Sequence, residues 1–299
     1  MGRDLISELG KPREDTMAHR SLIGLIGVAA LVMTTGVVQA FDEAKYPNLK
    51  GQWGRFIVRG LPGQPSFDQT KGWGPYQQAP LTPEYQKILE ESMADQEKGG
   101  LGNYSTARCL PGGMPRMMVA FEPQEYIITP ETTYILIGEN DHYRRIFTDG
   151  RDWPTDLEPS YQGYSIGKWL DADGDGRFDT LEVETRNFKG PRTVEFSGIA
   201  LHDDNETIVR ERIYLDKSDA EVMHNEITII DHAFTRPWTV DKRYRRIRNV
   251  MWYEDNCNEN NNHVIIGKEN YFMSGDGYLM PARKGQSPPD LRYFRPPQK

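Results

Sequence analysis

The chain has 299 residues, of which 37% are hydrophobic and 27% charged, and its formal net charge is -8. This length allows one large domain with a substantial core, particularly in an all-β fold. The acidic balance makes the chain a poor candidate for nucleic-acid binding, because a phosphate backbone is recognised by a basic surface.

An apolar run near the N-terminus predicts export. Residues 22–38, LIGLIGVAALVMTTGVV, follow the basic pair His19-Arg20 and run into the segment Val38-Gln39-Ala40, which fits a small-residue cleavage site. This order is typical of a cleaved secretory signal peptide, and Met17 is a possible true start. The run is shorter than the ~20 apolar residues of a spanning helix, so cleavage is favoured over an uncleaved anchor. We expect a leader over 1–40 and a periplasmic or secreted protein without a stable membrane anchor.

The segment that follows the leader predicts one strand and one helix. Residues 41–80 are rich in Gly, Pro and Gln, with a strand expected over 53–58. Thr82 is a suitable N-cap before Pro83, and apolar residues then recur at helical spacing. These residues are Tyr85, Ile88, Leu89 and Met93. We expect an amphipathic helix over 83–98.

The rest of the chain reads as short strands. Runs rich in β-branched and aromatic residues alternate with turn residues. The runs cover 117–121, 126–129, 132–137, 143–148, 161–170, 178–188, 207–215, 222–230 and 238–247. Their short connections favour sequential antiparallel pairing, and closure into a barrel or a strongly curved sandwich would remove exposed edges. We expect one domain over 41–280 and a Pro-rich extended tail over 281–299.

Two cysteines, Cys109 and Cys257, fall in the exported part of the chain. An even pair in an oxidising compartment favours a disulfide, and two buried thiols are the alternative.

An acidic segment matches the calcium-loop pattern D-x-D-x-D-G-x5-E. Its candidate ligands are Asp171, Asp173, Asp175, Asp179 and Glu182, with Gly176 at the turn. The flanking residues predict strands, so we expect a structural Ca2+ in a β-hairpin instead of an EF-hand. A solvated acidic hairpin without an ion is the alternative. Glu182 is the least secure ligand, because the strand that follows can direct its side chain away.

Residues 163–167, GYSIG, match the nucleophile elbow G-x-S-x-G around Ser165. That motif needs a helix after the serine, whereas the acidic loop follows here, so a bend within a strand is the favoured interpretation.

Alternation along three strands places polar residues on apolar faces. Tyr143 and Phe147 place Arg145 inward, and the same pattern places Glu211 and Asn225 inward. Buried charges are normally paired, so an ion pair of the Arg145–Glu211 type inside a core is one interpretation. The other is a barrel mouth in which these groups orient a small apolar ligand.

Candidate catalytic groups are Asp149 and His202, which we expect in turns near strand ends, together with Glu211. The histidines at 142, 224, 232 and 263 show no metal-ligand spacing, and the sequence contains no phosphate loop, dinucleotide fingerprint or zinc cluster.

An ordered set of segments resembles a family of secreted bacterial proteins of unassigned function. The segments are CLPGGMPRMM (109–118), TDGRDWP (148–154), PSYQGYSIGKW (159–169), ERIYL (211–215), TRPWTV (235–240) and CNENN (257–261). The resemblance covers roughly residues 50–265 and implies a lipocalin-like β-barrel whose two cysteine motifs are disulfide partners. The chain departs from the pattern at 170–179, so the calcium prediction does not come from the family.

Together these patterns predict an exported, antiparallel calycin-like barrel that binds a small, mainly apolar molecule in its interior. One alternative is a periplasmic enzyme of hydratase, dehydratase or isomerase type. Another is an envelope interaction module whose barrel is filled by its own side chains.

Overall fold

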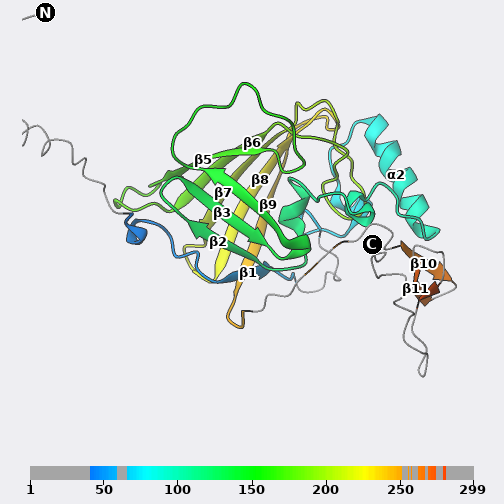
Figure 1. The fold of residues 1–299 in the computed structure, drawn as a ribbon, viewed down its shortest axis with the longest axis horizontal. Helices are drawn as coiled ribbons and strands as arrows, with labels where there is room; N and C mark the ends of the chain where they lie inside the picture. Colours follow the sequence, from blue (N-terminus) through cyan, green and yellow to red (C-terminus); the bar gives the residue numbers. More distant parts are fainter. Residues whose placement is uncertain are drawn as a thin grey trace, which may run out of the picture. The chain divides into compact units, whose positions relative to one another are not determined.

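Nine strands wrap into a closed barrel in the computed structural model of the chain (Figure 1). The structure describes residues 41–58, 66–250, 255, 257, 262–266, 269–273 and 279–280. The predicted leader over 1–40 and the predicted tail over 281–299 lie outside the described residues. Among the helices that are described, none is long and apolar enough to cross a membrane.

The barrel strands follow one another around the barrel in chain order. They are β1 (Gln52–Arg55), β2 (Gln124–Ile128), β3 (Thr132–Ile137), β4 (His142–Phe147), β5 (Tyr164–Leu170), β6 (Thr180–Arg186), β7 (Ile208–Leu215), β8 (Val222–Ile230) and β9 (Trp238–Ile247). β1 closes the barrel by pairing with both β2 and β9. The β-rich barrel predicted from short, regularly spaced runs is therefore confirmed.

One pairing departs from the predicted antiparallel order. β4 and β5 run parallel, with Ile146 opposite Ser165 and Phe147 opposite Ile166. A parallel pair needs a connection of about a dozen residues or more, and residues 148–163 supply it. The barrel is thus mixed.

A small separate sheet contains β10 (Asn262–Ile266), β11 (Glu269–Met273) and β12 (Leu279–Met280). Its two neighbouring pairs are antiparallel.

The predicted helix forms as α2 (Pro83–Glu97), with Thr82 as its N-cap. Backbone hydrogen bonds from Thr82 to Ala233 and from Thr235 to Pro80 attach its N-terminal end to the β8–β9 connection. Near its C-terminal end the Ser92 hydroxyl donates to the Ser197 carbonyl at 3.1 Å.

Five 3-10 helices complete the described helical structure. They are η1 (Glu43–Lys45), η2 (Gly74–Gln77), η3 (Ser105–Arg108), η4 (Arg116–Val119) and η5 (Glu139–Asp141). η4 forms where a strand was predicted over 117–121, and its four side chains are all buried. A short run that is buried on every side shows no periodicity by which a helix and a strand can be distinguished.

Cys109 and Cys257 form a disulfide with a Cα–Cα distance of 5.6 Å. The bond links η3, which precedes β2, to a residue beyond β9.

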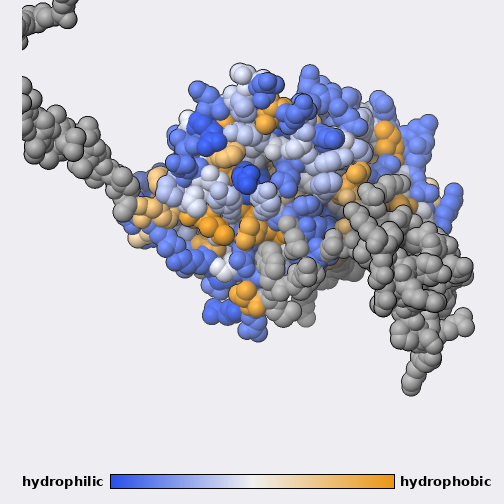
Figure 2. All heavy atoms as spheres, viewed as in Figure 1, coloured by the Kyte–Doolittle hydropathy of each residue, from blue (hydrophilic) through white to orange (hydrophobic). Residues whose placement is uncertain are grey.

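The apolar core lies mainly inside the barrel. Its fully buried members include Trp53, Ile135, Ile146, Leu181 and Ile227. The face shown in Figure 2 is mostly hydrophilic, and its hydrophobic residues form separate patches.

Candidate functional site

A buried ion pair spans the barrel interior. Arg144 of β4 donates from both terminal nitrogens to the Glu211 carboxylate of β7, at 3.0 and 2.5 Å. Both residues are 2% exposed. Charge-assisted hydrogen bonds are stronger than neutral ones, and the bidentate geometry adds both energy and geometric specificity.

Neighbouring polar side chains complete the pair. Arg144 also donates to Ser165 at 3.2 Å and to Thr185 at 2.8 Å, and Asn225 donates to Glu211 at 2.9 Å. Each side chain comes from a different barrel strand, and all are buried. Two buried charges are tolerated only when such extra hydrogen bonds replace water.

The predicted orientation of Arg145 is wrong, because the β4 side chains alternate in the opposite phase. Arg144 and Ile146 point inward, while Tyr143 and Arg145 are exposed on the outer face. The Arg145 guanidinium lies 5.1 Å from the Tyr143 ring centroid. Glu211 and Asn225, by contrast, lie inside the barrel where alternation placed them.

Ser165 is not a candidate nucleophile. It is buried in the middle of the interior network, where its hydroxyl contacts Thr185 at 2.9 Å and accepts from Arg144. No helix follows it, since β5 runs to Leu170. The segment 163–167 therefore lacks the strand-turn-helix context of a nucleophile elbow.

The three candidate catalytic residues are not brought together. Asp149 pairs with Arg151 at 2.6 Å, whereas Glu211 is sequestered with Arg144. Hydrogen bonding with Arg151 holds the pKa of Asp149 below its ordinary value, which favours the carboxylate over a general acid. His202 lies beside Asp204, and no hydrogen bond joins it to Asp149 or Glu211.

Histidine and carboxylate groups do converge at a second place, where two loops meet. His202 Nδ1 lies 3.1 Å and His232 Nδ1 2.5 Å from the same Asp204 oxygen. The sequence shows no metal-ligand spacing at His232 and does not single out Asp204, because the two histidines lie on separate loops. We name His202, Asp204 and His232 the histidine cluster.

The acidic loop brings three of its five predicted ligands together. The carboxylates of Asp171, Asp173 and Asp175 can place one oxygen each within 4.8 Å of one another. Asp179 accepts a hydrogen bond from the Ala172 amide at 3.3 Å. Glu182 lies on β6, where it pairs with Arg212 at 3.4 Å.

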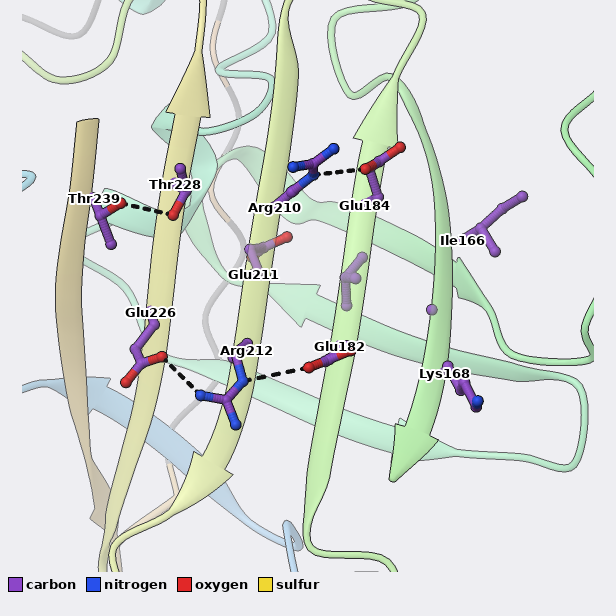
Figure 3. Close-up of a pocket in the computed structure, with 12 residues that line it drawn as sticks. Ile166, Lys168, Glu182, Glu184, Arg210, Glu211, Arg212, Glu226, Thr228 and Thr239 are labelled. Atoms are coloured by element: carbon purple, nitrogen blue, oxygen red, sulfur yellow. Dashed lines mark hydrogen bonds and ion pairs between the residues drawn. The ribbon is translucent and has the colours of Figure 1, made fainter. Parts of the chain in front are cut away.

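A hollow of about 500 Å3 lies on the outer face of β5–β9 (Figure 3). It is lined by Ile166, Gly167, Lys168, Glu182, Val183, Glu184, Arg210, Glu211, Arg212, Glu226, Thr228 and Thr239. Val183 and Glu211 turn their side chains into the barrel, so their backbones contribute to the floor. The outward charges form rows across the strands, with Arg210 paired to Glu184 at 2.7 Å and Arg212 to Glu226 at 3.2 Å.

Lys242 of β9 is a second buried charge and is 1% exposed. Its amine donates to the Ser66 carbonyl at 3.0 Å and lies 3.4 Å from the Phe67 carbonyl. Burial lowers the pKa of Lys242 to about 7. The nearby charges of Arg55 and Arg116 act in the same direction, whereas Asp68 and Glu195 act in the opposite one.

Burial also changes the acidity of other interior groups. It raises the pKa of Glu195 to about 7, against hydrogen bonds from Ser197 that act in the opposite direction. It raises the pKa of Tyr126 and of Tyr244 as well. The Tyr244 hydroxyl is hydrogen-bonded inside the protein, where it donates to the Met118 carbonyl at 2.7 Å.

A scan against models of known protein families finds no match for this chain, and a search of curated proteins finds no relative. Similarity to a known protein therefore assigns no role to any of these residues.

Arg144→Ala is expected to lower the free energy of unfolding by about 3–5 kcal/mol, because Glu211 would remain buried without its partner. Arg145→Ala, one residue away on the outer face, is the matched control and is expected to change it by less than about 0.5 kcal/mol. Urea unfolding of both variants measures the difference. Equal losses would contradict the inward placement of Arg144.

Lys242 is expected to make stability depend on pH. Its folded pKa of about 7 lies below the ordinary value of 10.5, so between these values the unfolded state binds more protons and stability rises with pH. From pH 7 to pH 9 we expect a gain of about 2 kcal/mol that Lys242→Met lacks. Denaturant unfolding of both proteins at the two pH values checks this, and parallel pH profiles would refute it.

Proposed function

We propose that this chain is an exported β-barrel binding protein whose ligand site is the hollow on the outer face of β5–β9. The observation that supports this proposal is the hollow itself. Its volume of about 500 Å3 falls within the range of small-molecule sites. Its walls combine charged groups with the apolar side chain of Ile166.

The interior is a weaker candidate for the ligand site. Arg144, Glu211 and Asn225 bond to one another there, so an interior ligand would have to separate a buried ion pair. Separating such a pair leaves an uncompensated buried charge. A ligand in the outer hollow would not have to separate a buried ion pair. The ion pairs there are exposed, and an exposed ion pair contributes only about 0–1 kcal/mol to stability.

The charges of the hollow define the proposed ligand. The carboxylates of Glu184 and Glu226 already pair with Arg210 and Arg212. Lys168 points outward from β5 without an ion-pair partner among the described residues (Figure 3). We therefore propose a small molecule with an apolar body and an anionic group that pairs with Lys168.

Export is part of the same proposal. The apolar run over 22–38 has the pattern of a signal peptide, and the Cys109–Cys257 disulfide is the kind of bond that persists in oxidising compartments. The resemblance to secreted bacterial β-barrel proteins supports the same location.

An envelope interaction module without a small ligand is the second candidate function. The buried Arg144–Glu211 pair and the apolar side chains that the barrel strands turn inward favour it. The enzyme alternative lacks comparable support, because Asp149, His202 and Glu211 each have separate partners.

Native mass spectrometry of the protein purified from its own host tests the ligand proposal. We expect an organic adduct that is retained by the wild type and lost in Lys168→Glu, which reverses the unpaired charge. Arg145→Glu makes the same reversal on the outer face of β4 and is expected to keep the adduct. Absence of an adduct from the wild type would favour the interaction module, and equal retention in both variants would exclude the hollow.

We also propose that the acidic loop binds one structural Ca2+. Asp171, Asp173 and Asp175 provide oxygen ligands at suitable mutual distances, and Ca2+ takes oxygen ligands at about 2.3–2.6 Å. A divalent cation would relieve the repulsion among these carboxylates. The pair between Glu182 and Arg212 supports a ligand set that leaves Glu182 out.

Asp173→Asn is expected to weaken Ca2+ binding tenfold or more, because it removes one anionic ligand. Glu182→Gln removes the same charge from the neighbouring strand and is expected to leave the affinity within about twofold. Isothermal titration of chelator-treated protein with Ca2+ measures both. A wild type that takes up no Ca2+ would identify the loop as solvated surface.

A further inference from the structure

We propose that the histidine cluster, His202, Asp204 and His232, binds one divalent transition-metal ion. The three residues can each offer one ligand atom, and all of these atoms lie within 4.8 Å of one another. Tetrahedral ligands at about 2.0–2.2 Å from Zn2+ lie roughly 3.3–3.6 Å apart. The present separations of 3.1 Å and 2.5 Å from the Asp204 oxygen need only small outward shifts to admit an ion.

A nitrogen of His202 that lacks a hydrogen-bond partner is a second observation in favour of a bound metal ion. The Nδ1 atom of His202 is buried and has no hydrogen-bond partner, although the side chain is 41% exposed. Asp204 lies at ion-pair distance from this nitrogen but does not satisfy it as a hydrogen bond. A buried polar atom without a partner is unfavourable, and the lone pair of a neutral imidazole is a good metal ligand.

A buried carboxylate holds the two ligand loops together. Asp231 precedes His232 in the chain, and its Oδ1 accepts from the His202 amide at 3.0 Å and from the Ala233 amide at 2.8 Å. Its other oxygen accepts from the Thr207 hydroxyl at 2.5 Å. Because one side chain fixes both loops, the two histidines are positioned before any ion arrives. Such preorganisation lowers the cost of binding.

A second carboxylate lies beside the far side of His232. Glu206 Oε2 is 3.6 Å from His232 Nε2, while the Nδ1 atom of the same ring faces Asp204. Metal-bound histidines usually direct their other ring nitrogen to a carboxylate, a carbonyl or a water. Glu206 thus occupies the place of an orienting residue behind a ligand.

The donor set selects the class of ion. Two imidazole nitrogens and one carboxylate favour Zn2+ and related transition metals over Ca2+ or Mg2+, which prefer oxygen ligands alone. Three protein ligands leave at least one coordination position for water or another molecule, as at catalytic zinc sites. The side-chain exposures of 41% for His202 and 61% for His232 make such a position accessible.

Isothermal titration with Zn2+ tests the proposal on the full chain, stripped of metal and carrying no polyhistidine tag. We expect one Zn2+ per chain in the wild type. His232→Ala and Asp204→Asn are each expected to weaken binding tenfold or more, and Glu206→Gln by about 10–100-fold. Co2+ bound at the same site should give a visible absorption band that Zn2+ abolishes.

His224→Ala is the matched control. His224 also lies between carboxylates, at 2.9 Å from Asp241 and 3.1 Å from Asp216, but no second histidine of the described residues joins it there. We expect this variant and Asp173→Asn in the acidic loop to keep the wild-type Zn2+ affinity. His232→Gln, with an uncharged side chain at an exposed position, repeats the loss without a large change in volume.

Absence of Zn2+ binding to the wild type at millimolar concentration would overturn the proposal. So would affinity that survives His232→Ala and His232→Gln, or that is lost equally in His224→Ala. Thermal unfolding of each variant without metal verifies that it is folded.

Discussion

The guanidinium of Arg144 and the carboxylate of Glu211 meet inside the barrel, away from water, and both must be compensated for the hydration that they lose. Their strands, β4 and β7, are separated by β5 and β6 in the barrel, so the pair connects parts of its wall that are not hydrogen-bonded to each other. Ser165, Thr185 and Asn225 contribute further hydrogen bonds from three other strands. The position of each strand is therefore tied to a geometry that a shift in register would break.

This network also decides where chemistry can occur. Arg144 and Glu211 satisfy each other, so these two charges are not free to bind a guest, although the Asn225 Oδ1 atom beside them has no hydrogen-bond partner. Further functional groups lie at the loops and on the outer face. The outer hollow beside Lys168 and the histidine cluster are two such places. One is a charged surface of five adjacent strands, and the other is a junction of two loops that Asp231 holds together.

Patterns within short stretches of the sequence predicted most of the helices and strands. Most of the features that they failed to predict depend on contacts between residues that are distant in the chain. Turn residues and β-branched runs predicted every barrel strand to within a few residues, because turn chemistry and β propensity are properties of short local segments. The alternation along β4 predicted the wrong inward face, because the aromatic residue Phe147 lies on the outer, partly solvated face. There its ring stacks on Tyr164 and lies under the Arg151 guanidinium. The parallel β4–β5 pair depends on the path of residues 148–163, and spacing alone does not specify that path.

The two candidate metal sites differ in the same way in how far the sequence could predict them. The acidic loop is contiguous, so its pattern could be read from the sequence directly. His202 and His232 come from different connections, and only the closed barrel brings them to a shared carboxylate.

The disulfide has a topological consequence for the barrel. Bonding Cys109 to Cys257 closes a covalent ring that contains β2 to β9, whereas β1 lies on the chain before the ring begins. β1 is also the shortest barrel strand and meets β2 through only two residue pairs. The disulfide therefore does not tie β1 into the covalent ring, and this seam of the barrel is held by the pairing of β1 with β2 and β9 and by the buried Trp53 side chain.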